Sequence, residues 1–189
     1  MADDRKITIA KLDAARRQLE TAITLWFNDG DPVSIHTLAC AAYEIIHVVS
    51  KTKNRWQDLL FDSLVIKDEY RNEWTKRLKE PANFFKHARN DPDGSLDFDP
   101  AVSEGFILFA LVGLRDIVKQ MSRTEAAYIW WLHFHRPDLL TQGGREAFSK
   151  MFSAEQILDA RTLPKALFFT TFVEANSDGA HVVGRGTIR

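Results

Sequence analysis

Hydrophobic residues recur along most of this chain at intervals of three and four positions, the spacing of an amphipathic α-helix. In residues 4–28 an apolar stripe alternates with charged positions and stops at the Asn-Asp-Gly sequence of residues 28–30. The next segment opens with Asp31 and Pro32, an N-cap acid followed by proline at the first helical position. The pattern predicts a helix from Pro32 to about Thr52. This helix is apolar over more than half of its circumference, so we expect it at the centre of the fold.

The middle of the chain is more polar and is interrupted by proline. We expect a short amphipathic turn or helix around residues 56–61 and a surface helix over residues 67–79 with a narrow buried edge. Pro81 either starts a new helix or kinks the old one, because proline lacks a backbone N–H and clashes with the preceding turn. Residues 82–90 continue with helical spacing, and residues 91–94 (Asp-Pro-Asp-Gly) are typical of a turn.

The last third carries further helix-start signals. Asp99-Pro100 repeats the acid–proline pattern and predicts a helix to about Met121. Two serines followed three residues later by Glu or Gln resemble capping boxes, and one more proline opens a last helix: Ser122 with Glu125, Ser153 with Gln156, and Pro164. The sequence therefore predicts an all-α fold, a bundle of six to eight helices. We expect a central bundle in residues 1–122, short helices in 123–175 packed on it or on a partner, and a disordered tail in 176–189.

Composition narrows the class of protein. The 189 residues include 25 Lys and Arg against 26 Asp and Glu, a net charge of −1, so no global basic field draws the chain to nucleic acid. Cys40 is the only cysteine, which excludes an intrachain disulfide and suits a reducing cytoplasm. The N-terminal sequence is charged, and no window approaches 18 uncharged apolar residues. We expect a cytoplasmic protein with no membrane span.

Several polar residues interrupt the apolar second helix. His36, Cys40, Tyr43 and His47 fall on one face, and Glu44 lies beside His47. His36 and His47 are about 16 Å apart along a helix, so they cannot bind the same metal ion. Glu44 and His47 match the Glu-x-x-His pattern of di-iron bundles, but the chain has no second copy. In a structural interpretation this glutamate and histidine satisfy each other in the core.

A second polar cluster follows two phenylalanines expected to anchor a helix in the core. It lies where that helix ends and a loop begins, a place where binding and catalytic residues concentrate. Basic side chains there also complement the helix dipole, so a purely structural role stays open. The cluster consists of Lys86, His87, Arg89, Asn90 and Asp91.

Residues 37–47 resemble the central helix of HEPN domains, small helical bundles of prokaryotic defence and toxin systems. The same segment, with residues 83–88 and 91–93, resembles uncharacterised bacterial proteins of similar length that carry an FFKHA-x-x-DPD segment. HEPN ribonucleases carry an Arg, a polar residue and then a His that four to six residues separate from the Arg, and Arg89-Asn90 matches the first half. The His would fall at positions 94–96, which are Gly, Ser and Leu, so the motif is incomplete. The resemblance thus implies a degenerate or absent ribonuclease activity, and a homodimer.

Three hypotheses follow. The chain is a HEPN-like binding module for RNA or a protein partner, in which any residual catalysis would use His87, Arg89 and Asn90. Alternatively it is a helical-bundle metal-binding protein or enzyme with Glu44, His47, His87 and Asp91 as ligands, and with His36, Tyr43 and Lys86 as further site candidates. A third possibility is a purely structural bundle. No glycine-rich phosphate loop is present, so we expect no nucleotide cofactor, and the sequence identifies no other cofactor. The aromatic residues of the last third also favour a homodimer.

Overall fold

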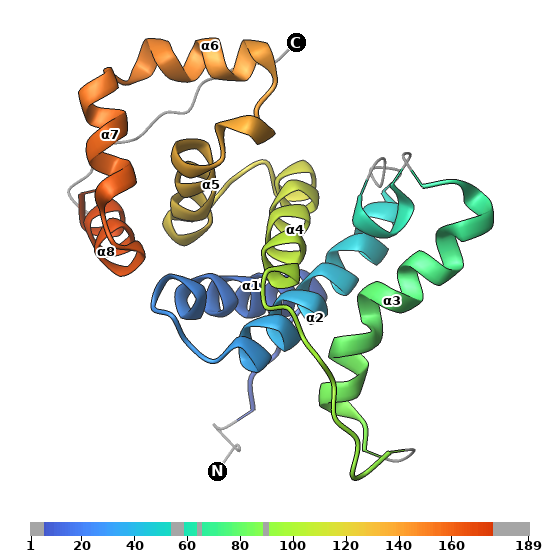
Figure 1. Cartoon of the computed structure of the whole chain (residues 1–189). Helices are drawn as coiled ribbons and strands as arrows, with labels where there is room; N and C mark the ends of the chain where they lie inside the picture. Colours follow the sequence, from blue (N-terminus) through green and yellow to red (C-terminus); the bar gives the residue numbers. More distant parts are fainter. Residues whose placement is uncertain (1–5, 54–58, 64–65, 89–90, 176–189) are drawn as a thin grey trace. The chain divides into compact units, whose positions relative to one another are not determined.

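The computed structural model describes residues 6–53, 59–63, 66–88 and 91–175. Within these ranges the chain forms eight α-helices and two short 3-10 turns and no strand, as predicted for an all-α bundle (Figure 1). It divides into two compact units, Met1–Gln120 and Met121–Arg189. The tail expected in residues 176–189 lies outside the described residues.

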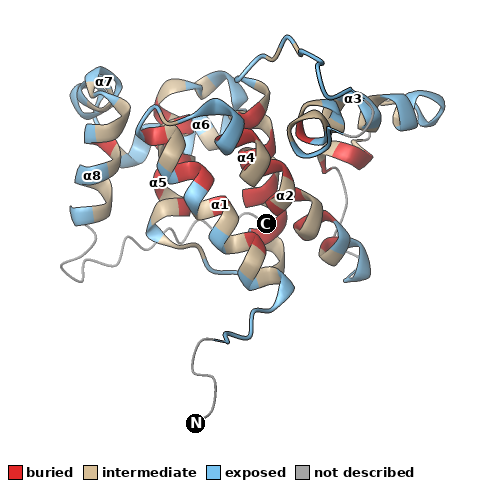
Figure 2. Cartoon of the chain, turned by 90° about the horizontal axis from the view of Figure 1, so that it is seen from below, coloured by how far each residue is buried: buried red, intermediate tan, exposed pale blue. Residues whose placement is uncertain are grey.

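The core of the first unit is built by three helices: α1 (Lys11–Phe27), α2 (Pro32–Thr52) and α4 (Val102–Val118). The helix predicted to be central is α2, and it packs against both α1 and α4. It begins as expected, because the Asp31 carboxylate accepts a hydrogen bond from the Ser34 backbone N–H at 2.7 Å. Figure 2 shows the buried residues gathered on the faces where these helices meet.

Gly113 lets α4 approach α2 closely. A methyl group added at Gly113 would lie 2.7 Å from Ile46 Cγ2, closer than two carbon atoms pack. Because glycine has no side chain, α4 and α2 can lie this close together at Gly113 and Ile46.

The α2 helix has the predicted bounds, Pro32–Thr52, and is largely apolar. By length and composition alone it could cross a membrane, and it is the one helix of the described residues that meets this test. Half of the relevant window is buried inside the protein, and the core helix of a globular domain meets the same test.

The third helix, α3 (Asp68–Lys86), is one element with Pro81 inside it, so Pro81 does not start a new helix. Contacts on both sides of the proline hold the helix. On one side Trp74 Nε1 donates to Leu60 O at 3.0 Å, and on the other Phe85 packs against Phe98. Only Ala82 is buried among its 19 residues, and its outer face is exposed in Figure 2. The helix ends at Lys86, four residues before the predicted end.

The connection between α2 and α3 contains η1 (Leu60–Asp62), the short element expected near residues 56–61. Residues 54–58 and 64–65 on either side of it lie outside the described ranges. The turn predicted at residues 91–94 is present, since Gly94 N donates to Asp91 O at 3.0 Å.

The second unit consists of α5 (Arg123–His135), η2 (Pro137–Leu139), α6 (Gln142–Met151), α7 (Ala154–Thr162) and α8 (Lys165–Ala175). Both predicted capping boxes form, at Ser122 with Glu125 and at Ser153 with Gln156. The α6 helix has no counterpart among the predicted helices. Aromatic rings fill the centre of the unit, where Phe134 packs against Phe148, Phe152 and Phe168.

Candidate functional site

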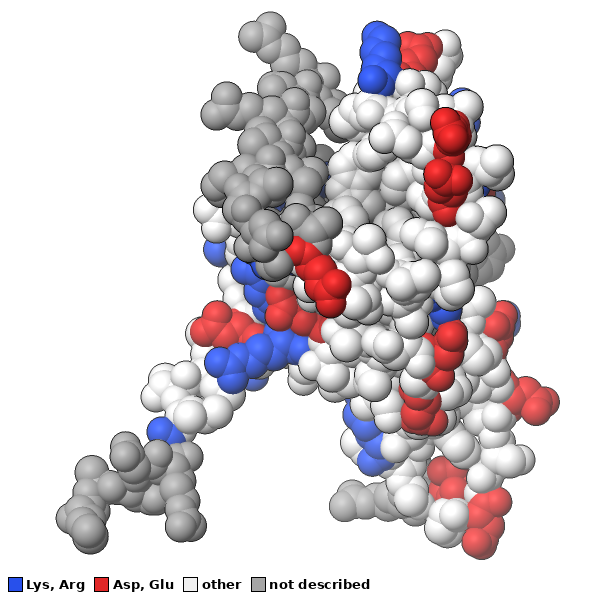
Figure 3. Space-filling model, turned by 90° about the vertical axis from the view of Figure 1, so that its left-hand side faces the viewer, with Lys and Arg blue, Asp and Glu red and all other residues white. Residues whose placement is uncertain are grey.

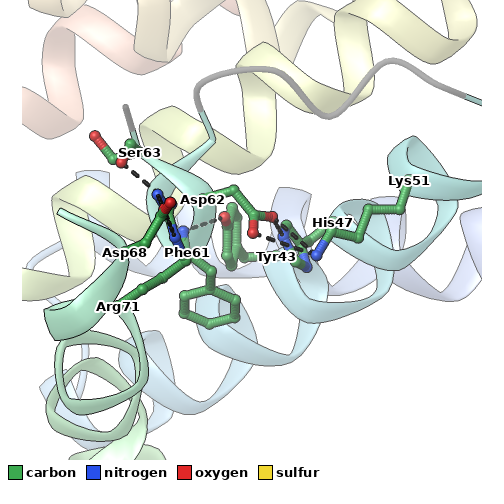
Figure 4. A network of polar contacts seen from close by, with 8 residues as sticks. All are labelled: Tyr43, His47, Lys51, Phe61, Asp62, Ser63, Asp68 and Arg71. Carbon is green, nitrogen blue, oxygen red and sulfur yellow. Dashed lines mark hydrogen bonds and ion pairs between the residues drawn. The ribbon is translucent and has the colours of Figure 1, made fainter. Parts of the chain in front are cut away.

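The most polar part of the first unit lies where the C-terminal half of α2 meets η1 (Figure 4). His47 Nε2 donates a hydrogen bond to Asp62 Oδ2, and both residues are buried. Lys51, one turn further along α2, places its Nζ 3.2 Å from the same carboxylate. The histidine predicted as a site candidate is therefore paired with an aspartate of η1.

The carboxyl group of Asp62 is held in its charged form. Burial alone would raise its pKa, but hydrogen bonds from His47 and Lys51 outweigh burial, and the pKa lies below its ordinary value. An ionised Asp62 is thus the acceptor for two donors from α2. This arrangement fixes the position of η1 on the helix.

Two more hydrogen bonds hold η1 from either side. The Tyr43 hydroxyl accepts from the Phe61 backbone N–H at 3.0 Å, and burial raises the pKa of that hydroxyl, so it stays protonated. Arg71 on α3 donates to Ser63 O at 3.3 Å and binds Asp68 at 2.6 Å, as Figure 4 shows. The predicted site candidate Tyr43 thus contributes to anchoring the connector.

Glu44 does not pair with His47. Its Oε1 lies 2.9 Å from Lys79 Nζ on α3, and both side chains are about one third exposed. The same ammonium group lies 4.6 Å from the centre of the Phe61 ring, a cation–π contact. The structural interpretation in which Glu44 and His47 satisfy each other was therefore wrong, because each finds a partner on a different element.

His36, at the other end of α2, lies in an aromatic enclosure. Its ring meets the edges or faces of Phe98, Phe106 and Phe85 at centroid distances of 4.9, 5.3 and 6.0 Å. Its Nδ1 hydrogen-bonds the Ser103 hydroxyl at 3.2 Å, and its Nε2 has no hydrogen-bond partner. Burial, with a smaller contribution from the Lys86 charge, lowers the pKa of His36 to about 4. The ring is therefore neutral at pH 7.

Cys40, between these two histidines, is buried in the same helix. Burial raises the pKa of its thiol to about 12, so the nucleophilic thiolate is not formed at neutral pH.

Of the four residues predicted as metal ligands, two have other side-chain partners and two are exposed. Glu44 binds Lys79 and His47 binds Asp62, whereas His87 and Asp91 are exposed. In the part of the chain that the structure describes, no group of three or more His, Cys, Asp or Glu side chains could hold a metal ion.

Three members of the predicted cluster at the end of α3 lie in the described ranges, and all three are exposed to solvent: Lys86, His87 and Asp91. Lys86 is the last residue of the helix, and His87 follows as its C-cap, with its backbone N–H bonded to Asn83 O at 3.0 Å. Arg89 and Asn90, the residues that resemble half of the HEPN motif, lie outside the described residues.

Two residues that the sequence interpretation missed complete the buried contacts. Asp62 and Ser103 are 15 and 67 positions from the histidines that they bind. Asp62 directly follows the apolar Leu59–Phe61 stretch, and an acid in that position is a weak signal of a buried carboxylate. Neither models of known protein families, nor curated proteins, nor solved structures give a match to this chain.

Proposed function

We propose that this chain is a HEPN-like, non-catalytic binding module that contacts RNA through the exposed C-terminal half of α3 and the residues that follow it. The observation that carries the proposal is a contrast in exposure. The polar residues His36, Tyr43 and His47 of α2 are buried and bonded inside the protein, whereas three basic residues of α3 are exposed.

The charge of this segment suits a phosphate backbone. Residues 76–89 contain five Lys and Arg residues and one glutamate. Lys76, Arg77 and Lys86 are exposed on α3, and the Arg77–Glu73 pair at 2.6 Å is itself exposed, so it competes weakly with a phosphate. In the sequence Arg89 follows Lys86 by three positions, and Arg89-Asn90 resembles half of the HEPN motif.

The surface is local, which predicts weak and salt-dependent binding. On the face drawn in Figure 3, acidic and basic side chains both occur and in places lie next to one another, in line with the net charge of −1. Affinity should therefore depend on a few phosphate contacts, each of which contributes about −0.7 to the slope of log affinity against log salt for a single strand.

The test is titration of a fluorescent single-stranded RNA at several salt concentrations. Lys76→Gln/Lys86→Gln should weaken binding roughly three- to tenfold at low salt and reduce the slope by about 1.4, because two phosphate contacts are lost. The control, Lys11→Gln/Lys53→Gln, makes the same change in net charge at exposed lysines of α1 and the end of α2. Equal effects of the two double variants would contradict the proposal.

Two further outcomes distinguish the other hypotheses. In the first, RNA does not bind and the wild type captures a protein partner, whereas Lys76→Gln/Lys86→Gln does not. That result would make the surface a protein interface instead. Stoichiometric metal in the purified protein that disappears on His47→Ala would favour the metal-binding alternative with Glu44, His87 and Asp91. The homodimer stays a prediction, which light scattering at tens of micromolar would test.

A further inference from the structure

The outward side of α2 is apolar, although a helix that faces solvent on one side normally carries polar residues there. Its buried residues lie on one arc, and the opposite arc is half-buried or exposed. Steps of four and three residues connect the middle of this opposite arc into one line, which we call the outward stripe. The outward stripe consists of Ser34, Leu38, Ala41, Ile45, Val48 and Thr52.

The outward stripe carries no charge over about five turns of helix. The charged residues at its edge are already paired with other elements, Glu44 with Lys79 at 2.9 Å and Lys51 with Asp62 at 3.2 Å. Val48, in contrast, is 59% exposed. Uncharged apolar surface of this kind is typical of a place where a partner binds.

The order of residues along the outward stripe is self-complementary. When two copies of a helix run antiparallel across a two-fold axis, residue i of one copy meets residue j of the other, and j meets i. An axis at the middle of the stripe pairs Leu38 with Val48. It also pairs Ala41 with Ile45, a small side chain with a large one, so the two helices can interdigitate. The hydroxyl residues at the two ends of the stripe meet in the same way.

The charges at the two ends of α2 favour this antiparallel direction. Asp29 and Asp31 precede the helix, and all of their side of it is acidic, whereas Lys51 and Lys53 lie at its other end; all four residues are exposed. Antiparallel copies place the acidic end of one helix beside the basic end of the other, whereas parallel copies would place like charges together. The helix dipoles also attract one another only in the antiparallel arrangement.

We propose that the outward stripe of α2 is the contact surface for a second copy of this chain, bound antiparallel across a two-fold axis. The contact is about 30 Å long, the length of a 21-residue helix. One pair of helices buries less area than the roughly 1,600 Å² of a standard interface, so the dissociation constant should be on the order of 10 µM. The proposal assigns the predicted homodimer to α2 rather than to the aromatic residues of the second unit, and it is independent of RNA binding by α3.

The experiment is sedimentation velocity of the full chain from about 1 to about 200 µM, a range in which the wild type should pass from monomer to dimer. Val48→Glu places a charge inside the contact and should raise the dissociation constant at least about tenfold. The matched control is Val33→Glu, the same change on the same helix at a residue that is 40% exposed and lies outside the outward stripe. It should dimerise as the wild type does.

Cysteine cross-linking tests the direction and register of the two helices. A mixture of Leu38→Cys and Val48→Cys should form a mixed disulfide under mild oxidation, because antiparallel pairing brings these positions together. Either variant alone should cross-link poorly, since about 15 Å along the helix axis separates the equivalent positions of the two copies. The natural Cys40 is buried and its thiol stays protonated, so it does not interfere.

Four results would overturn the proposal. A wild type that stays monomeric at about 200 µM would exclude a dimer of the expected affinity. Equal dimerisation of Val48→Glu and Val33→Glu would place the contact on another surface. Leu38→Cys that cross-links alone as well as in the mixture would show parallel helices. A monomeric wild type that binds vesicles of neutral phosphatidylcholine, when Val48→Glu does not, would make lipid the partner of the outward stripe.

Discussion

The two ends of α2 each bury a histidine, yet the two surroundings are opposite. His36 lies among phenyl rings with one hydrogen bond to Ser103, whereas His47 lies between Asp62 and aromatic rings with Lys51 on the same carboxylate. Both side chains project from one face of one helix. The difference comes from the elements that cover the two histidines. His36 is covered by α3, α4 and the loop that carries Phe98, and His47 is covered by η1. A buried histidine is therefore not by itself a sign of chemistry.

The largest effect on stability is expected from Phe106, whose ring packs near side chains at both ends of α2. Phe106 lies 5.3 Å from His36, 5.6 Å from Tyr43 and 6.2 Å from Phe61, measured between ring centroids. Phe106→Ala should lower the free energy of unfolding by about 3–5 kcal/mol, because a fully buried ring is replaced by a cavity. Chemical denaturation measures the loss. A decrease below about 1 kcal/mol would mean that the two ends do not share a core.

The His36 end should make the protein sensitive to mild acid. Its pKa of about 4 lies below the unfolded value near 6.5, so between these values the unfolded chain binds a proton that the folded one does not. The stabilisation is present above about pH 6.5 and is lost as the pH falls to about 4, a total of roughly 3 kcal/mol.

Denaturation at a series of pH values tests this expectation. His36→Leu/Ser103→Ala removes the titrating ring together with its partner and should flatten the dependence over this range. His87→Gln, a change at an exposed histidine, should leave it as in the wild type. If the double variant keeps the wild-type dependence, His36 is not the group responsible.

The His47 end should depend on its ion pair at neutral pH. Asp62→Asn removes the charge that accepts from His47 and Lys51 and should cost about 2 kcal/mol of unfolding free energy. The lowered pKa of Asp62 places the corresponding acid loss below about pH 4, where the carboxylate is protonated.

A double-mutant cycle identifies the pair. The effects of Asp62→Asn and His47→Gln should add to more than the effect of both changes together, because either one alone breaks the same contact. Strict additivity would show that the two side chains are not coupled.

The smallest effect is expected from Tyr43→Phe. This change removes only the hydroxyl that accepts from Phe61 N and should cost about 1 kcal/mol. Hydrogen exchange at the Phe61 amide should increase by more than exchange in α1. An unchanged rate at Phe61 would contradict the role assigned to this hydroxyl.

Much of the fold could be predicted because its signals are local. Asp31 with Pro32 and the two serine capping boxes act within one turn, and each forms as expected. The α6 helix was missed because two glycines, which favour helix poorly, occupy its first turn and only Phe148 is buried. The helix continues past Pro81, one of the two predicted alternatives being a new start there, and distant contacts of Trp74 and Phe85 hold α3 on either side of it.

The site was predictable only in part, because its contacts join residues from different elements. Helical spacing placed His36, Tyr43 and His47 on one buried face, and the structure buries all three. Their partners come from η1 and α4, and the sequence alone contains no rule that assigns Asp62 rather than Glu44 to His47. Which polar groups meet is decided by the packing of helices, which sequence periodicity does not specify.

The most direct test compares Lys86→Gln with Tyr43→Phe in the same RNA titration and the same thermal melt. The account predicts that Lys86→Gln weakens RNA binding severalfold with little change in melting temperature, because Lys86 is exposed on α3. It predicts that Tyr43→Phe lowers the melting temperature and leaves the affinity of the folded protein unchanged. RNA binding lost in Tyr43→Phe but kept in Lys86→Gln would contradict the division between a structural α2 and a binding α3.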